Sequence, residues 1–216
     1  MKLNKDSNPA SLARVKARPA NWEALFSQPT REEYSKFISD LFVNNKIDGD
    51  VVECGVGQGK SLKCFADYLP STVKITGFDS FIGLPEVDKI DKHSSRIQKG
   101  HLSYDYEATQ ELFRQHDNVQ LVRGFFDSTL SQYDGAKIGL LHLDCDIYSS
   151  YKTCLSQLYD KVVSGGIIMF DEYYREFWQY GKYAGAPVAI DEFLEGKNQE
   201  MKYYPSLGGK AYLIKH

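Results

Sequence analysis

Two apolar runs of the sequence end in acidic residues. Asp144 and Asp146 follow the first run in IGLLHLDCDIY, and Asp171 and Glu172 follow the second in GGIIMFDEYY. Unpaired carboxylates are costly to bury, so strands that end in this way need a positive partner. Carboxylate oxygens are the ligands that hard divalent cations prefer, and magnesium often keeps waters or substrate oxygens as well. We therefore expect Asp144, Asp171 and Glu172 to bind a magnesium ion where the fold brings them together.

The same acids have a second interpretation as helix caps. Negative charge is favoured at a helix N-terminus, and a helix is expected after each of the two runs. Capping suits Asp146, which precedes the polar segment IYSSYKT, but it does not account for three acids at one edge. Zinc is not expected, because no His or Cys stands with ligand spacing beside these acids.

A glycine-rich turn, ECGVGQGKS, is the second feature that could do chemistry. Gly55, Gly57 and Gly59 lack side chains, so a ligand could lie against the backbone and the N-terminus of the following helix. The spacing is G-x-G-x-G, whereas dinucleotide sites have G-x-G-x-x-G. Glu53 would repel a pyrophosphate but could accept hydrogen bonds from an ammonium group. The turn therefore predicts a zwitterionic ligand without phosphate, such as S-adenosylmethionine.

Two further acids follow the expected second and third strands. Asp79 ends VKITGFDS, at the place where an acid binds the hydroxyls of an adenosyl ribose in folds of this kind. It could instead cap the turn before FIGLP. Asp127, in RGFFDSTL, would lie beside the adenine and accept from its amino group, or it would cap a short helical turn.

Periodic apolar residues indicate the elements that must position these groups. Strands are expected within 48–59, 73–80, 119–124, 137–144 and 165–171, and helices over 30–45, 60–69, 107–116, 148–163 and 186–196. Residues 201–216 are typical of two strands joined by a turn. The alternation predicts an α/β fold with a single doubly wound, mostly parallel sheet and an antiparallel C-terminal edge hairpin. Ligands of such sheets bind outside the carboxyl ends of the strands, which is where the acids and glycines fall.

Three segments lie outside this alternation. Residues 1–29 are interpreted as an N-terminal arm, followed by one domain over 30–216. The polar stretch 86–106 lacks a strong period and is expected to be a long loop that closes over the ligand. The aromatic-rich segment DEYYREFWQYGKYAG would overhang the second substrate, with Arg175 or Lys182 meeting a phosphate, or it would be a packing surface.

Composition excludes several classes of function. The chain has 216 residues and a formal net charge of −3, which provides no basic field for nucleic acid or an anionic membrane. No apolar run approaches the roughly 20 residues that a membrane span needs, and the first residues contain no apolar signal region. Neither CxxC nor zinc-ligand spacing occurs, so reduced core thiols and a cytoplasmic location are expected for the four cysteines: Cys54, Cys64, Cys145 and Cys154.

The motifs VVECGVGQGKS, GFDSFIGLPE, RGFFDSTL, LLHLDCDIYSSY and GGIIMFDEYY, with APVAIDEF after them, resemble the macrocin O-methyltransferase (TylF/MycF-like) family. The resemblance covers about residues 48–195. It implies a class I methyltransferase domain, S-adenosylmethionine as the donor, magnesium dependence and a hydroxyl acceptor, which is commonly a sugar. A homo-oligomer is compatible with it. The family's metal ligands match Asp144, Asp171 and Glu172, and its cofactor positions match Glu53, Gly55, Ser61, Asp79, Ser80 and Asp127.

The expected reaction is an in-line displacement in which an acceptor oxygen attacks the sulfonium methyl group. Asp144 is the expected catalytic base, with Asp146 and His142 as alternatives. Metal-dependent catechol methyltransferases carry a lysine three residues after the metal-binding Asp, but Ile147 stands there. Two rival functions remain, namely an NAD-dependent oxidoreductase on the same fold and a non-catalytic protein that binds an adenosyl ligand.

Overall fold

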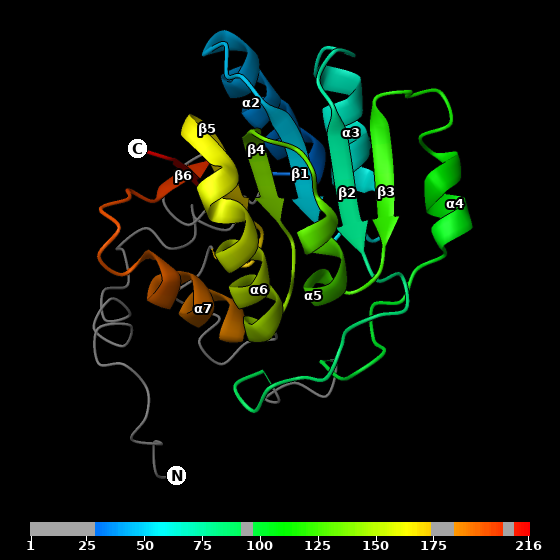
Figure 1. The fold of residues 1–216 in the computed structure, drawn as a ribbon, viewed down its shortest axis with the longest axis vertical. Helices are drawn as coiled ribbons and strands as arrows, with labels where there is room; N and C mark the ends of the chain where they lie inside the picture. Colours follow the sequence, from blue (N-terminus) through cyan, green and yellow to red (C-terminus); the bar gives the residue numbers. More distant parts are fainter. Residues whose placement is uncertain (1–28, 92–96, 174–183, 205–209) are drawn as a thin grey trace.

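The computed structural model describes residues 29–91, 97–173, 184–204 and 210–216, and seven strands of these residues form one sheet in the order β3-β2-β1-β4-β5-β7-β6 (Figure 1). The first five strands run parallel, and β7 is antiparallel to both β5 and β6. The predicted doubly wound sheet with an antiparallel edge is therefore confirmed. The strands are β1 (Asp50–Cys54), β2 (Ile75–Asp79), β3 (Val119–Arg123), β4 (Ile138–Leu143), β5 (Val162–Phe170), β6 (Lys202–Tyr204) and β7 (Lys210–Ile214).

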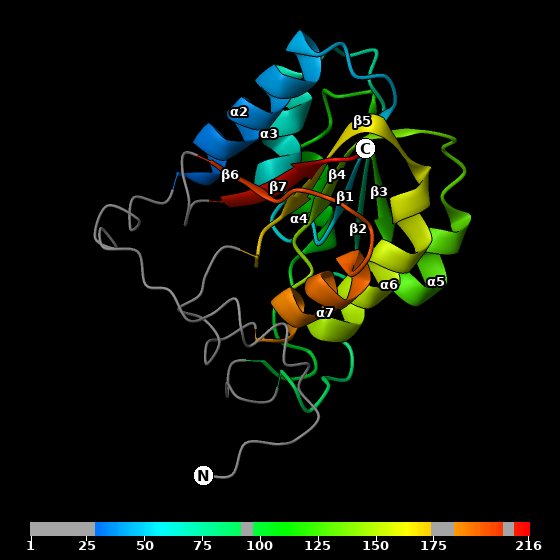
Figure 2. The same cartoon turned by 90° about the vertical axis from the view of Figure 1, so that its left-hand side faces the viewer.

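Helices cover both faces of this sheet. In Figure 2, α2 and α3 lie on one face, and α5, α6 and α7 lie on the other. The described α-helices are α2 (Arg31–Asn44), α3 (Lys60–Tyr68), α4 (Tyr106–Glu111), α5 (Phe126–Thr129), α6 (Tyr148–Leu158) and α7 (Gly185–Leu194), and short 3-10 turns follow α5 (Leu130–Gln132) and α6 (Tyr159–Lys161).

The core consists of two layers because neighbouring strand residues point to opposite faces. Val51 and Leu140 pack with α2 and α3. Their neighbours Val52 and Leu141 pack with α6 and α7. All four side chains are fully buried, which is why these strands are continuous apolar runs in the sequence rather than alternating ones.

The strand order reverses between β1 and β4, and the arrowheads of the first four strands point to one edge of the sheet (Figure 1). The chain after β1 approaches the chain after β4 closely at this edge. A Cβ atom on Gly55 would lie 1.8 Å from the carbonyl oxygen of Asp144, and the φ angle of Gly55 is +94°. Only glycine fits there, so the turn after β1 brings the backbone directly against the acids after β4.

Helix α2 begins where the sequence predicts. The Thr30 hydroxyl accepts from the Glu33 amide, and the Glu33 carboxylate accepts from the Thr30 amide, so the two residues form a capping box. The Tyr34 hydroxyl donates to the Ala211 carbonyl at 2.7 Å, which ties α2 to β7. Arg31, the first helical residue, is thereby held at the carboxyl edge of the sheet.

Two predicted helices are too long. The helix expected over 107–116 ends at Glu111. Tight turns follow it, in which the Phe113 amide donates to the Gln110 carbonyl, and these turns bury the Phe113 side chain. The helix expected over 148–163 ends at Leu158. Strand β5 then begins at Val162 rather than at residue 165, since the β-branched pair that follows the helix is drawn into the sheet.

The segment between β2 and α4 is an ordered irregular loop in its described part. Ile82 and Ser103 form an isolated bridge, and the Leu84 amide donates to the His101 carbonyl at 2.8 Å. Leu84 also belongs to a small buried cluster with Val87, Ile97 and Ile147. The described residues between 86 and 105 agree with the predicted long loop, α4 begins at Tyr106, and closure of the loop over a ligand stays a prediction. The predicted arm, apart from residue 29, and Arg175 and Lys182 lie outside the described residues.

Within the described part of the chain, no helix has both the length and the apolar character needed to cross a membrane.

Candidate functional site

A cavity of about 720 Å³ lies at the carboxyl edge of the sheet. Its wall consists of the glycine turn after β1, the end of β2, the following loop, the segment after β3 and the acids after β4 and β5. Eight of the ten residues expected to bind cofactor or metal line this one cavity: Gly55, Gly57, Asp79, Ser80, Asp127, Asp144, Asp171 and Glu172.

Asp79 holds the glycine turn and faces the cavity at the same time. One carboxylate oxygen accepts from the Gly57 amide at 2.8 Å, and the other accepts from the Phe81 amide at 2.7 Å. Burial raises the pKa of Asp79, although these two amides lower it. Both interpretations of Asp79, as a cap of the turn and as a residue of the site, are therefore compatible with its position. Ser80 donates to the Gly83 carbonyl at 2.7 Å and supports the same wall.

Glu53 and Ser61 do not line the cavity. Both are buried, at 0% and 1% exposure, and the Ser61 hydroxyl donates to Glu53 at 2.6 Å. Glu53 thus points from β1 towards α3, in which Ser61 is the second residue. Direct binding of a ligand by these two residues stays a prediction, and their position shows a supporting contact beneath the turn.

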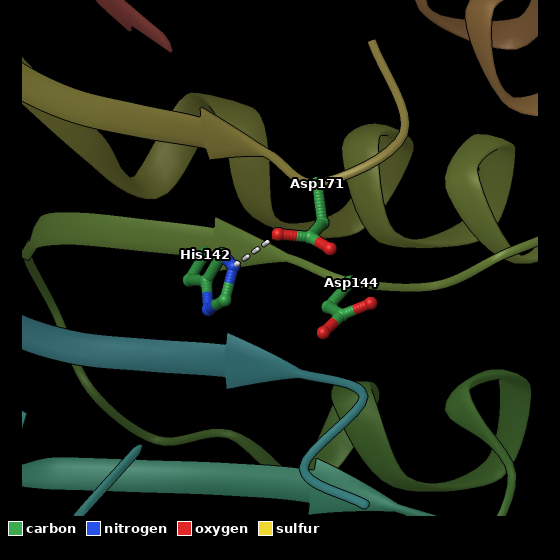
Figure 3. A group of neighbouring side chains, drawn as sticks. All are labelled: His142, Asp144 and Asp171. Atoms are coloured by element: carbon green, nitrogen blue, oxygen red, sulfur yellow. Dashed lines mark ion pairs between the residues drawn. The ribbon is translucent and has the colours of Figure 1, made fainter. Parts of the chain in front are cut away.

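His142 lies between two carboxylates beneath the cavity. Its Nδ1 atom is 3.4 Å from Glu53, and its Nε2 atom is 3.9 Å from Asp171 (Figure 3). Burial lowers the pKa of His142, but the charges of Glu53 and Asp171 outweigh it and raise the pKa to about 9. A protonated imidazole therefore separates the two acids. His142 does not line the cavity, so it is not placed to meet an acceptor.

Asp144 and Asp171 each have a cationic partner from a distant part of the chain. Arg31 donates to Asp144 at 2.9 Å, and the Lys210 ammonium lies 2.7 Å from Asp171. Burial raises the pKa of Asp171, but Lys210 and His142 lower it far more, so its pKa lies below its ordinary value.

The sequence alone did not single out these two cations. Arg31 had one signal, because a cation in the first turn of a helix, beside Glu32 and Glu33, opposes the helix dipole. Lys210 had none, since only the tertiary pairing of β7 with β5 brings it near Asp171.

A second group of acids faces α6. Carboxylate oxygens of Asp144, Asp146 and Glu172 lie within 4.8 Å of one another. Glu172 is buried and in contact with the Tyr151 hydroxyl. Burial, followed by the charges of Asp144, Asp146 and Asp171, raises the pKa of Glu172 well above its ordinary value. Asp146 has a φ angle of +63°, a strained conformation of the kind that clusters at functional sites.

The predicted trio of metal ligands is thus divided between two groups. Asp144 and Asp171 lie with His142 in one, and Asp144 and Glu172 lie with Asp146 in the other, each group within 4.8 Å. The division follows from the backbone, because consecutive residues at the end of a strand point to opposite sides. Asp144 belongs to both groups, so a cation held by all three residues of either group would contact it.

The structure does not support the interpretation of these acids as helix caps. Helix α5 has Phe125 at its N-cap without a side-chain cap, so Asp127 is not its cap and that interpretation is wrong. Helix α6 has Ile147 at its N-cap, so Asp146 is not its N-cap residue and that interpretation is wrong as well. The first amide of α6, on Tyr148, instead donates to Asp91 at 2.8 Å. The other oxygen of Asp91 accepts from the Gly185 amide at the start of α7 at 2.9 Å.

The sequence matches a known protein family and two named relatives. A model of the macrocin O-methyltransferase (TylF) family matches residues 31–197. The chain is similar to demethyldecarbamoylnovobiocin O-methyltransferase of Streptomyces niveus, with 29% identity over 170 residues that cover 72% of this chain and 64% of the relative. It is 28% identical over 144 residues to 8-demethyl-8-(2,3-dimethoxy-alpha-L-rhamnosyl)-tetracenomycin-C 4'-O-methyltransferase of Streptomyces olivaceus, covering 59% of this chain and 54% of that relative. The chain thus spans less than two thirds of the length of either relative.

Solved structures of O-methyltransferases share the fold. The calicheamicin methyltransferase CalS11 superposes with a TM-score of 0.73 at 21% identity, over 95% of this chain and 90% of that one. The O-methyltransferase NovP superposes with a TM-score of 0.70 at 23% identity, over 86% and 79% of the two chains.

Proposed function

Because the chain belongs to the macrocin O-methyltransferase family, we propose that it transfers a methyl group from S-adenosylmethionine to a hydroxyl group of a small molecule, with magnesium as the metal. Both curated relatives are named O-methyltransferases. One structure with the same fold, TomG of Streptomyces achromogenes, was solved with S-adenosylmethionine, and another, PaMTH1 of Podospora anserina, was solved with S-adenosylhomocysteine.

One observation carries the proposal, namely that the glycine turn shares one cavity with the acids that follow β2, β3, β4 and β5. The described residues that line it include two cations, Arg31 and Lys60, against seven acids, which are Asp79, Glu86, Asp127, Asp144, Asp146, Asp171 and Glu172. A negative surplus of this size disfavours the phosphates of a nicotinamide dinucleotide and suits a sulfonium donor and a divalent cation. The rival oxidoreductase also requires the G-x-G-x-x-G spacing, which the turn lacks.

The cofactor would lie across the ends of β3, β2 and β1. Asp79, at the end of β2, would accept hydrogen bonds from the ribose hydroxyls, with Ser80 beside it. Asp127, which lines the cavity after β3, would accept from the adenine amino group. Gly55 and Gly57 present backbone atoms to the cavity, and the sulfonium end of the cofactor would lie against this turn.

The donor set suits a magnesium ion. The acids offer several carboxylate oxygens within 4.8 Å of one another, with Asp144 common to both groups, and hard oxygen ligands are what magnesium requires. Burial and then the neighbouring acids raise the pKa of Glu172, and a bound cation would relieve the repulsion from those acids. We propose Asp144, Asp171 and Glu172 as the ligands. When bound, the ion would orient the acceptor hydroxyl and lower its pKa.

The residues of the chain would then position the two substrates and remove one proton. The acceptor oxygen attacks the methyl carbon as the carbon–sulfur bond breaks, so collinear placement supplies much of the rate. The hydroxyl proton passes to a carboxylate within hydrogen-bond reach. We propose Asp144 for this step, and Asp146, which lines the same cavity two residues later, is the alternative.

The acceptor we propose is a sugar or glycoside. The relative from Streptomyces olivaceus is named for methylation of a rhamnosyl tetracenomycin, and a solved neighbour is titled a TDP-rhamnose 3'-O-methyltransferase. Ser149, Ser150 and Thr153 on α6 line the cavity beyond the acids, and their hydroxyls could bind sugar hydroxyls.

A cytoplasmic location is proposed from the thiols, because the buried Cys145 and Cys154 sulfurs lie 3.7 Å apart without a disulfide.

Calorimetric titration tests the proposal. Magnesium is titrated into protein saturated with S-adenosylhomocysteine, for the wild type, for Asp171→Asn and for Asp40→Asn, an exposed acid on α2 that serves as the control. We expect both ligands to bind the wild type and the control, with the metal lost in Asp171→Asn. Binding of S-adenosylhomocysteine without magnesium would remove the metal from the proposal. Binding of neither ligand, with binding of a nicotinamide nucleotide, would replace the methyltransferase with the oxidoreductase.

A further inference from the structure

Arg31 connects the two halves of the site. Its guanidinium donates to the Ser61 hydroxyl at 3.3 Å, where α3 begins beneath the glycine turn, and to Asp144 at 2.9 Å. Arg31 lines the cavity, and its side chain retains 45% exposure. The guanidinium therefore remains within reach of a ligand in the cavity while it neutralises the acid that both metal-ligand groups share.

A divalent cation at Asp144 would meet this guanidinium. Arg31 occupies an oxygen of Asp144, and its positive charge repels a second cation close by. Lys60 is the other described cation of the cavity wall, and it is exposed at the start of α3. The cavity wall thus holds one cation in direct contact with a proposed metal ligand, and that contact opposes metal binding.

The orientation of the cofactor brings a competing anion to the same guanidinium. With its ribose at Asp79 and its adenine beyond β3, the other end of S-adenosylmethionine runs in the opposite direction across β1 towards β4, because the sheet order is β3-β2-β1-β4. That end carries a carboxylate, and Arg31 lies at that end of the cavity. A guanidinium binds a carboxylate through two parallel hydrogen bonds.

We propose that Arg31 couples the binding of the cofactor to the binding of the metal. Without ligands it pairs with Asp144, and when the cofactor binds it turns to the cofactor carboxylate and releases Asp144 for magnesium. The inference rests on the proposed function and adds to it an order, with cofactor before metal. Coupling is reciprocal, so magnesium must strengthen cofactor binding by the same factor.

The first test uses the wild-type protein alone. Magnesium affinity is measured by calorimetry without cofactor, with S-adenosylhomocysteine, and with S-adenosyl-3-thiopropylamine, which keeps the amine and lacks only the carboxylate. We expect S-adenosylhomocysteine to tighten magnesium binding by about tenfold or more, within the usual range of coupling between sites. The analogue without the carboxylate should tighten it by less than about twofold.

The second test removes the guanidinium. Arg31→Gln should bind magnesium several-fold more tightly than the wild type when no cofactor is present, and S-adenosylhomocysteine should no longer change that affinity. Its affinity for S-adenosylhomocysteine should fall about tenfold or more, whereas its affinity for the carboxylate-free analogue should not change. Arg114→Gln, which removes an exposed arginine paired with Glu111, is the control and should behave as the wild type.

The outcomes separate this inference from the proposed function. Wild-type protein that binds both ligands independently, or equal coupling with the two adenosyl compounds, would overturn the role of Arg31 and leave the methyltransferase standing. Failure of the wild type to bind S-adenosylhomocysteine at all would overturn the proposed function itself. The wild-type comparison needs no variant, so it decides the matter even where Arg31→Gln fails to fold.

Discussion

Asp91 and Glu172 are two buried carboxylates that both contact α6, and the fold surrounds them very differently. Asp91 is 1% exposed and accepts a backbone amide on each oxygen, from Tyr148 and from Gly185. Glu172 is 8% exposed, contacts a tyrosine hydroxyl and lies within 4.8 Å of two other acids. The first is balanced by the N-termini of two helices, and the second is surrounded by charge of its own sign.

The difference separates an acid that the fold satisfies by itself from one that we propose as a metal ligand. An acid whose oxygens both receive backbone donors contributes to stability as it stands. An acid beside other acids is held at a cost that a cation would remove. Both residues are buried and acidic, so neither property distinguishes the proposed metal ligand from the structural acid. The balance of charge around the carboxylate does.

The largest effect is expected from replacing Glu172, which lies among other acids. Glu172→Gln should lower kcat/KM for methyl transfer about 10³-fold, which corresponds to several kcal/mol of lost metal-dependent stabilisation. The free energy of unfolding in the presence of EDTA should not fall, because the substitution removes a carboxyl group whose pKa is raised by burial and by three neighbouring acids. Steady-state kinetics and urea denaturation measure the two quantities. Retained activity would show that this acid belongs with Asp91 as a structural residue.

The opposite pattern is expected for Asp91. Asp91→Ala should lower the free energy of unfolding by about 3 kcal/mol, because two helix amides lose a charged acceptor. Magnesium affinity of the folded protein should stay within about twofold of the wild type. Urea denaturation and calorimetry measure these quantities, with Asp88→Ala, an exposed acid of the same loop, as the control. A loss of metal binding with unchanged stability would reverse the assignment.

The third effect depends on pH and concerns the cation between the acids. The folded pKa of His142, about 9, lies above its ordinary value of about 6.5. Its contribution to stability is therefore complete below about pH 6.5 and is lost as the pH rises through about 9, with about 2 kcal/mol lost between pH 7 and pH 9.

Urea denaturation of metal-free protein across this range measures the loss. We expect His142→Gln to show a flatter profile than the wild type, since the substitution removes the titrating group. Parallel profiles would mean that the imidazole is neutral in the folded protein and that the two acids are separated without its charge.

The smallest change in stability is expected for an acid that caps a helix at a solvent-exposed position. The Asp105 side chain accepts from the Ala108 amide at the start of α4 at 2.9 Å and is exposed. Asp105→Ala should cost about 1 kcal/mol or less, measured by the midpoint of urea denaturation. A loss as large as that of Asp91→Ala would mean that burial adds nothing to the contribution of a helix cap.

Much of this arrangement could be predicted from the sequence because it depends on local patterns. Apolar runs that end in Asp79, Asp144 and Asp171 are buried parallel strands, and parallel strands bring their carboxyl ends to one edge. The turn at Gly55 is equally local, since close approach of two backbones requires glycine there. The fold class, the position of the cavity and eight of the ten predicted ligand residues that line it follow from these features.

The rest depends on side-chain direction and on distant segments. The division of Asp171 and Glu172 between two groups arises from the alternation of the backbone after β5, which a list of acids does not convey. Arg31 and Lys210 reach the site from 113 and 39 residues away in the sequence. The early end of α4 results from the burial of Phe113, where tertiary packing overrides helix propensity.

The position of β7 has a consequence for the order in which the protein can be made. Strand β7 lies between β5 and β6, and β6 pairs with no other strand among the described residues. A nascent chain that has emerged only as far as β6 therefore leaves the edge of β5 open and Asp171 without Lys210. Residues 210–214 must be synthesised before β7 can pair with β5 and complete the sheet. The candidate site can therefore be completed only after β7 has been synthesised, and an interrupted product would expose a strand edge of the kind that recruits chaperones.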